Sequence, residues 1–174
     1  MKKLFLCALS LALVLTLAAC GGADTTLQSQ NGILSSFETT DIDGNKLDQS
    51  ILEGRKLTLV NIWATSCTPC IEEMPYLGEL AHEYRDQGVQ IIGIVADGTG
   101  QQDMARSIAE QTGAGYIHLM PSEDLENLLS QVYAVPTTIF ADENGCQVGS
   151  TYMAAMDKEG WIETIEKTLA LLTQ

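Results

Sequence analysis

Apolar positions along the chain fall into short runs and helical patterns that alternate with one another. Apolar runs, β-branched in part, predict buried strands over residues 56–63, 89–96, 116–120 and 137–141, the third at or near a sheet edge. Helices are predicted over residues 69–87, 101–111, 122–132 and 157–172. The first helix ends at Gly88, and Ser122 is placed to cap the third helix in front of acidic residues.

Two turn sequences predict hairpins within this pattern. Residues 41–45 contain an Asp-Gly step that would join residues 37–40 to 46–47 in an N-terminal β-hairpin. Residues 142–145 would turn the last strand back into a returning strand over 146–152. The layout is that of an α/β protein with a mixed sheet, parallel where helices cross over and antiparallel at the hairpin.

The N-terminal residues do not belong to this pattern. Residues 1–19 combine Lys2 and Lys3 with an apolar run and predict a signal peptide, which is too short for a stable membrane-spanning helix. The run L-A-A-C-G resembles the lipobox of bacterial lipoproteins, which implies a lipid on Cys20; an ordinary signal peptide is the alternative. Residues 20–34 are rich in Gly, Thr, Gln and Ser and predict a flexible tether to a domain over 35–174.

Composition supports one globular domain. Of the 174 residues, 45% are hydrophobic and 18% are charged. The net charge of −14 opposes binding to nucleic acid and to anionic lipid surfaces, and removal of the signal peptide would make the charge more negative. We expect a monomer and no nucleic-acid partner. The acidity favours solubility and identifies no substrate.

The five cysteines separate into different roles. Cys7 would be lost with the signal peptide and Cys20 would carry the lipid. Cys67 and Cys70 form a close pair, and one such pair in an exported domain indicates chemistry rather than a structural framework. Cys146 is left over, and we expect a half-buried strand cysteine, with a redox or intermolecular role as the alternative.

The Cys67–Cys70 pair lies where a predicted strand ends and a predicted helix begins. The N–H groups and positive dipole end of that helix favour thiolate, so we expect a pKa below the free value of about 8.5. Cys67 would be the nucleophile and Cys70 would resolve the mixed disulfide. Zinc is the first alternative, but it needs about four ligands and the chain offers only His82, His118 and Cys146 besides. A structural disulfide, the second, would stabilise little across so short a loop. We therefore expect no metal and no cofactor.

Two motifs carry a more specific resemblance. Residues 61–75 read N-x-W-A-T-x-C-x-P-C-x-x-E-x-P, and residues 133–145 contain Y-A-V-P-T-T-I-F followed by D-E-N-G. Both are similar to motifs of the TlpA/ResA-type thioredoxin-like lipoproteins and secreted reductases, over about residues 35 to 172. The resemblance implies a thioredoxin fold, with a central mixed β-sheet flanked by helices. It also implies a thiol–disulfide oxidoreductase.

The resemblance assigns roles around the two thiols. Cys67 would attack and Cys70 would resolve. Glu73 matches an acidic residue near the thiols, where it could relay a proton and raise a thiol pKa. The alternative for Glu73 is an ordinary first-turn glutamate, a role that Glu72 fits better.

Further residues surround the predicted site. Pro136 matches a proline with a cis peptide bond that faces the cysteines; a trans proline opening a strand is the alternative. A cis bond would expose the backbone of Val135 for pairing with an extended substrate. Trp63 could form a wall of the site or pack under its loop. His118, in an apolar strand, is expected to be a structural histidine.

The chain departs from the family pattern at two positions. Asn61 stands where thioredoxin has a buried aspartate, a function that Glu73 could replace. Ser66 stands where many relatives have tryptophan, which leaves the choice of partner open.

Three functions follow. The first, which the resemblance favours, is a lipid-anchored, extracytoplasmic reductase. The resemblance implies exported substrates such as apocytochrome c or other redox enzymes, and recharging by a membrane thiol-transporting protein. The second is an oxidase that donates its disulfide. The third is a metallochaperone or binding lipoprotein on the same fold.

Overall fold

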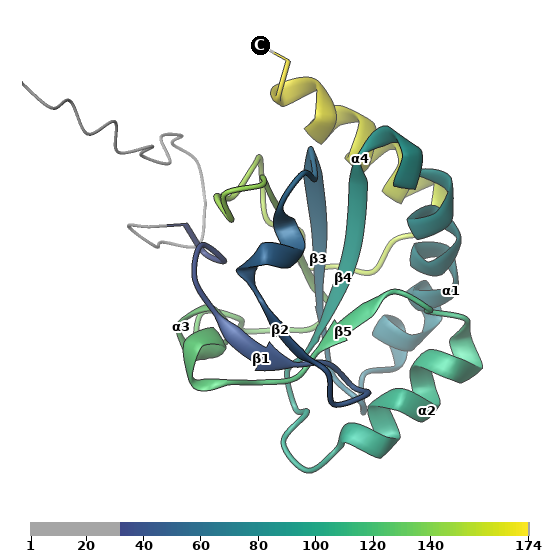
Figure 1. Ribbon diagram of the computed structural model, residues 1–174. Helices are drawn as coiled ribbons and strands as arrows, with labels where there is room; N and C mark the ends of the chain where they lie inside the picture. Colours follow the sequence, from purple (N-terminus) through teal and green to yellow (C-terminus); the bar gives the residue numbers. More distant parts are fainter. Residues whose placement is uncertain (1–31, 174) are drawn as a thin grey trace, which may run out of the picture.

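The computed structural model describes residues 32–173, in which a four-stranded mixed sheet carries helices on both faces (Figure 1). The predicted signal peptide, the lipid site Cys20 and most of the predicted tether lie outside the described residues. Strand order is β5-β4-β3-β6, with β3 parallel to β4, β4 parallel to β5, and β6 antiparallel to β3. The strands are β3 (Leu57–Trp63), β4 (Val89–Val95), β5 (Ile117–Leu119) and β6 (Thr137–Ala141). The α/β class with a mixed sheet is confirmed.

Helices α1, α2 and α4 cover one face of the sheet. Their bounds are α1 (Thr68–Glu83), α2 (Gln102–Thr112) and α4 (Lys158–Leu171). All seven residues of β3 are buried, because alternate side chains point to opposite faces and both faces are covered. Leu57 and Leu59 pack against α1 and α4, whereas Val60 and Ile62 pack on the other face with the N-terminal segment and α3 (Glu126–Leu129). None of the helices within residues 32–173 has the length and apolar character needed to cross a membrane.

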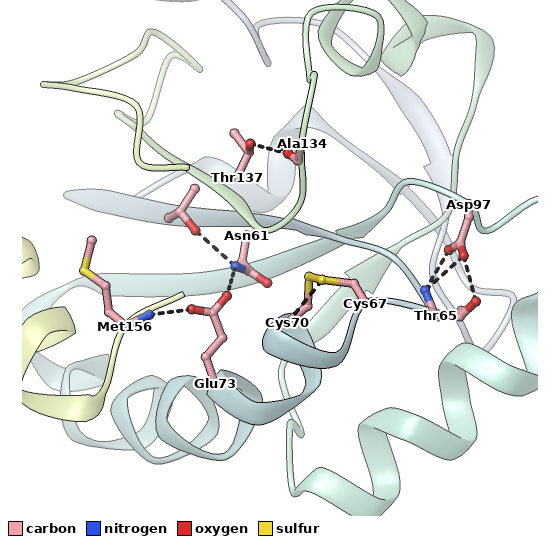
Figure 2. Close-up of a disulfide and its surroundings, with 10 residues drawn as sticks. Asn61, Thr65, Cys67, Cys70, Glu73, Asp97, Ala134, Thr137 and Met156 are labelled. Atoms are coloured by element: carbon pink, nitrogen blue, oxygen red, sulfur yellow. Dashed lines mark hydrogen bonds between the residues drawn. A yellow bond between two sulfur atoms is a disulfide. The ribbon is translucent and has the colours of Figure 1, made fainter. Parts of the chain in front are cut away.

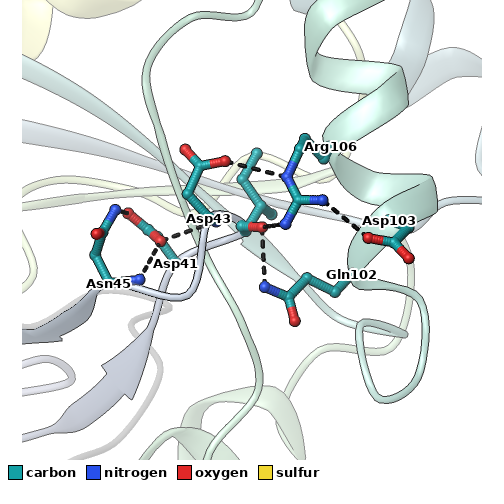
Figure 3. A network of polar contacts seen from close by, with 7 residues as sticks. Asp41, Asp43, Asn45, Gln102, Asp103 and Arg106 are labelled. Atoms are coloured by element: carbon teal, nitrogen blue, oxygen red, sulfur yellow. Dashed lines mark hydrogen bonds and ion pairs between the residues drawn. The ribbon is translucent and has the colours of Figure 1, made fainter.

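The predicted N-terminal hairpin is present and lies beside α2. Strands β1 (Glu38–Thr40) and β2 (Lys46–Asp48) are antiparallel. At the turn, the Asp41 carboxylate accepts the backbone N–H of Asn45 at 2.9 Å (Figure 3). Arg106 of α2 donates to Asp43 at 3.1 Å and to Asp103 at 2.8 Å, which joins the turn to the helix. Short 3-10 turns cover Gln49–Leu52 and Arg85–Gln87.

The third predicted helix is shorter than expected. It consists of a 3-10 turn over Glu123–Leu125 followed by α3. Ser122 occupies the N-cap position in front of Glu123 and Asp124, as predicted, but its side chain makes no capping hydrogen bond and its buried hydroxyl has no partner among the described residues. The chain leaves the helix through i→i+3 turn bonds that end at Val132.

The predicted returning strand over residues 146–152 is also not regular. Within the described chain it contacts β6 through two isolated bridges, Ala141 with Gln147 and Thr138 with Tyr152. Five steps along the returning segment oppose three along β6, so two extra residues bulge outward and interrupt the ladder. Gly149, inside this bulge, has a positive φ of 71°.

The first described residues pack against the turn after β6. Leu34 is buried in the core, and its N–H donates to the Gly145 carbonyl at 3.1 Å. Gly145 has a φ of 74°, and a Cβ there would lie 2.4 Å from the Leu34 backbone. Leu34 was assigned to the tether because Ile33 and Leu34, at the end of a polar stretch, show no strand or helix periodicity. It belongs to the domain.

Candidate active site

Cys67 and Cys70 form a disulfide at the junction between β3 and α1 (Figure 2). Cys67 caps the helix, where its Sγ accepts the backbone N–H of Cys70 at 3.3 Å. Cys67 is partly exposed, whereas Cys70 is fully buried and Pro69 occupies the exposed first turn. The sulfur that an external thiol or disulfide can reach is therefore that of Cys67.

The loop before Cys67 is held by Asp97, at the end of β4. The Asp97 carboxylate accepts the backbone N–H of Thr65 at 2.9 and 3.0 Å and the Thr65 hydroxyl at 2.7 Å (Figure 2). The N–H of Cys67 in turn donates to the Ala64 carbonyl at 3.0 Å. Asp97 was not among the predicted site residues, although the carboxyl ends of adjacent parallel strands meet at one edge of a sheet. Its position directly after a buried strand was the available signal.

Glu73 stands on α1 three residues after Cys70, and only 1% of its surface is exposed. Its Oε1 accepts the side-chain N–H of Asn61 at 2.9 Å. Its Oε2 accepts the backbone N–H of Met156 and the indole N–H of Trp161, both at 3.2 Å. Burial raises the pKa of Glu73 above its ordinary value, and these hydrogen bonds oppose the rise. The adjacent Glu72 is exposed, so the two glutamates have different environments.

The Glu73 contacts join segments that are far apart in the sequence. Asn61 comes from β3, whereas Met156 and Trp161 come from the loop before α4 and from α4 itself. Asn61 also donates to the Thr138 hydroxyl at 3.0 Å, and its own Oδ1 has no partner among the described residues. No local pattern predicts the contributions of Met156 and Trp161, because they depend on how α4 packs against α1.

A hollow beside Pro69 leads to Glu73. It has a volume of about 440 Å³. The lining residues are Pro69, Glu72, Glu73, Tyr76, Ala155, Met156 and Asp157. Glu73 is therefore buried but stands among the residues that line a surface hollow.

Trp63 and His118 form a buried pair beneath the site. Trp63 has no exposed surface, and its indole N–H donates to His118 Nδ1 at 3.2 Å. His118 Nε2 lies 2.9 Å from the Ala114 carbonyl, and burial lowers the pKa of His118 to about 4. The histidine is therefore neutral at pH 7 and has a structural environment, as expected. Trp63 packs under the loop and forms no wall that a substrate could touch.

The segment before β6 approaches the cysteines from another side. The Val135–Pro136 peptide bond is cis, as the resemblance implied. Val135 is half-buried and packs against the same cluster as Cys67. The Thr137 hydroxyl donates to the Ala134 carbonyl at 2.7 Å and fixes this bend (Figure 2).

The remaining cysteine and histidines lie apart from the pair. Cys146 is half-buried and follows the turn at the far end of β6, away from Cys67. His82 is exposed near the end of α1. Across residues 32–173, no three His, Cys, Asp or Glu side chains are grouped so that they could hold a metal ion.

Comparisons with known proteins agree with this fold and indicate the family. A family model described as Redoxin matches residues 28–168. The thiol-disulfide oxidoreductase ResA of Bacillus thuringiensis (strain Al Hakam) is 44% identical over 64 residues, which cover 37% of this chain and only 36% of that protein. The thiol:disulfide interchange protein DsbE of Vibrio cholerae is 36% identical over 132 residues, covering 73% of this chain and 67% of that protein.

Solved structures show the same fold. A thiol:disulfide interchange protein of the thioredoxin family from Chlorobium tepidum TLS superposes with a TM-score of 0.68 at 21% identity, covering 82% of this chain and 99% of that one. The thioredoxin fold is thereby confirmed. Because the Redoxin model spans most of the chain and the ResA and DsbE relatives are 44% and 36% identical to it over their matched residues, the protein belongs to the Redoxin family and is of the TlpA/ResA thioredoxin-like type.

Proposed function

We propose that this protein is a thiol–disulfide oxidoreductase that reduces disulfides in exported proteins. The observation that carries the proposal is the arrangement of an accessible sulfur on Cys67, a buried sulfur on Cys70 and a buried carboxylate on Glu73, one helical turn further on. The curated relatives ResA and DsbE carry names of the same activity.

The exchange would proceed in two steps from the reduced protein. The Cys67 thiolate attacks one sulfur of the substrate disulfide, forms a mixed disulfide and releases the other substrate sulfur as a thiolate that takes up a proton. Cys70 then loses its proton and attacks Cys67 Sγ, which closes the Cys67–Cys70 disulfide and releases the second substrate thiol. Two electrons pass from the protein to the substrate. A dithiol partner must return them.

Glu73 favours the reducing direction. Thioredoxin-fold proteins that act as strong oxidants stabilise the thiolate of their reduced form. A buried carboxylate near the thiols has the opposite effect, since its negative charge disfavours the thiolate. Glu73 would also accept the proton of Cys70, and the hollow beside Pro69, which Glu73 lines, would carry that proton to solvent.

Substrate binding would use the segment at Val135 and Pro136. A main chain laid beside Val135 would bring its disulfide to Cys67, in the manner of strand addition. Trp63 would support the loop from below rather than touch the substrate.

The proposed location is the outer side of the cell membrane, with a lipid on Cys20 and residues 20–33 as the tether, since Leu34 packs in the domain. A membrane thiol-transporting protein would supply electrons, and apocytochrome c or other exported redox enzymes would be substrates. Tethering raises the local concentration of membrane partners. We expect a monomer.

The test is insulin reduction by the full-length mature protein. The wild-type chain should reduce insulin, and Cys67→Ser should abolish the reaction. Cys70→Ala should accumulate mixed disulfides on Cys67, from which the natural substrates can be identified. Equal activity of Cys67→Ser and wild type would refute the exchange mechanism, and a reduction potential well above about −200 mV would refute the reducing direction.

A further inference from the structure

Several large hydrophobic side chains are exposed to solvent. Among the described residues they are Tyr76, Met104, Tyr133, Met153, Leu171 and Leu172. Tyr133 and Met153 are the most exposed of these, at 91% and 64%. A tyrosine ring almost wholly in water is unusual, since aromatic rings dominate contact energies when they are buried.

The exposure of Tyr133 does not result from a loose segment. Before it, the N–H of Val132 donates to the Leu129 carbonyl at 3.1 Å. After it, the Ala134 carbonyl accepts the Thr137 hydroxyl at 2.7 Å, and Val135 packs on the core. The backbone is therefore fixed on both sides, and the ring is presented outward at little cost in conformational entropy.

Met153 is presented in the same way. Just before it, Tyr152 exchanges two backbone hydrogen bonds with Thr138, at 2.7 and 2.9 Å. Three residues later, the Met156 N–H donates to Glu73. The intervening Ala154 and Ala155 are small and exposed, as is Ala134 beside Tyr133. Small side chains leave room for another backbone to approach.

The two segments lie on either side of the Cys67–Cys70 loop. Thr138 pairs with Tyr152 near the start of β6, and both segments extend from this pair. The start of β6 lies beside the carboxyl end of β3, because Thr137 pairs with Ile62. The segment of Tyr133 reaches the disulfide through Val135, which packs against the same cluster as Cys67. The segment of Met153 reaches it through Ala155, which lines the hollow with Pro69.

We propose that Tyr133 and Met153 are two apolar contact points for an unfolded polypeptide whose disulfide is presented to Cys67. This inference rests on the proposed function, because the exchange site defines the centre of the surface. The segment bound would be extended, with apolar side chains within a few residues of its cysteine. Such side chains are buried in folded proteins, so the surface selects unfolded chains over folded ones.

The charge of this surface restricts the partner further. Glu72 and Asp157 line the hollow between α1 and the segment that follows Met153, and both are exposed. Acidic side chains beside the substrate cysteine would be repelled by these carboxylates. The partner is therefore an apolar segment that is neutral or basic.

The test compares two disulfide-linked peptides, one with Phe and Leu beside its cysteine and one with Ser at the same positions. The reduced full-length mature protein should prefer the apolar peptide in kcat/KM, through KM. Tyr133→Ser should lower that preference by about 10-fold, because contacts of this kind account for most of the affinity of an interface. Met153→Ser should lower it by less, and Tyr133→Phe, which keeps the ring, should retain it.

Leu172→Ser is the matched control, since Leu172 is exposed at the opposite end of the sheet, in a hollow with Gly54 and Lys56. It should keep the full preference. An unchanged peptide preference in Tyr133→Ser would overturn the inference while leaving the oxidoreductase function in place. The inference would also be overturned if Tyr133→Ser altered the self-association of the protein but not its peptide preference. A wild-type chain that reduces neither peptide would instead overturn the proposed function.

Discussion

Replacing Glu73 with glutamine tests whether the charge of this carboxylate controls the two thiols. Glutamine can keep the local hydrogen bonds: its carbonyl can accept the N–H groups of Met156 and Trp161, and its amide can donate to the unpartnered Oδ1 of Asn61 after that side chain turns over. We therefore expect a folded variant in which the charge alone has changed.

The size of the effect follows from helix geometry. Cβ atoms three positions apart on a helix lie about 6 Å from one another, and we take this spacing for the separation of the Glu73 and Cys70 charges. At an effective dielectric constant of about 20, a unit charge at that distance disfavours a thiolate by about 3 kcal/mol, or about 2 pH units of thiol ionisation. Solvent in the hollow beside Pro69 weakens the interaction. We therefore expect the cysteine thiols of reduced Glu73→Gln to ionise at a pH about 1 to 2 units lower than those of reduced wild type.

The assay is thiolate absorbance near 240 nm in the reduced protein as a function of pH. Glu72→Gln is the control, because Glu72 is on the same helical turn but exposed. A Glu73→Gln titration identical to that of the control would refute the argument. Glu73→Ala should additionally lose about 2 to 5 kcal/mol of stability, because it leaves three described N–H donors without an acceptor.

The raised pKa of Glu73 also predicts the pH dependence of folding. In the folded state Glu73 holds its proton more tightly than in the unfolded state. The resulting stabilisation is present below the ordinary pKa of 4.5 and is lost as the pH rises through the raised value. In urea unfolding of the oxidised protein, wild type should therefore lose stability relative to Glu73→Gln as the pH rises above 4.5. The opposite slope would show that the hydrogen bonds outweigh burial.

Three further predictions concern the surroundings of the site. The pKa of His118 is lowered from 6.5 to about 4, so between these pH values the folded state binds fewer protons than the unfolded state. Acidification from pH 6.5 to 4 should therefore lower the free energy of unfolding of wild type by about 3 kcal/mol relative to that of His118→Gln. An equal pH dependence in both proteins would contradict this. Asp97→Ala removes the acceptor of the Thr65 hydrogen bonds and should slow peptide reduction by about 3- to 10-fold, with Asp97→Asn in between; equal rates for all three chains would show that the loop needs no support. A Cβ at Gly93 would lie 2.4 Å from His118 Nδ1, so Gly93→Ala should lower the free energy of unfolding by about 1 to 3 kcal/mol and lower the melting temperature. Gly115→Ala is the control, because a Cβ there would meet nothing within 4 Å. Similar melting temperatures for the two variants would argue against tight packing at Gly93.

Elements with strong local patterns were predictable. Strand β3 is an unbroken apolar run because both of its faces are covered, and the Asp-Gly turn specified the N-terminal hairpin. The returning strand failed because an alternating pattern does not show that two extra residues bulge out between Gln147 and Tyr152. The third helix was overestimated because Leu125 and Leu128, which anchor it, also fit a longer amphipathic pattern.

The site was predictable only in part for a similar reason. The cysteine pair and Glu73 stand in one motif, so their proximity follows from one helical turn. Trp161 meets Glu73 only because α4 packs beside α1, a contact between residues 88 positions apart. Alternation along β3 places Trp63 on the same face as Leu59, but its burial depends on which helices cover that face.

The contact between Leu34 and Gly145 determines how the domain would face its surroundings. Strand β6 runs from the disulfide end of the sheet to the turn that holds Leu34, so the chain enters the domain at the pole opposite Cys67. Seven residues of β3 separate the two poles by about 23 Å. A lipid on Cys20 would hold the domain by its inner pole, with the reactive sulfur facing away from the bilayer. Soluble substrates would then meet the disulfide unobstructed. A membrane electron donor would then have to extend outward to that height, or wait until the domain tips over on its tether. In that case tether length would set the rate of recharging.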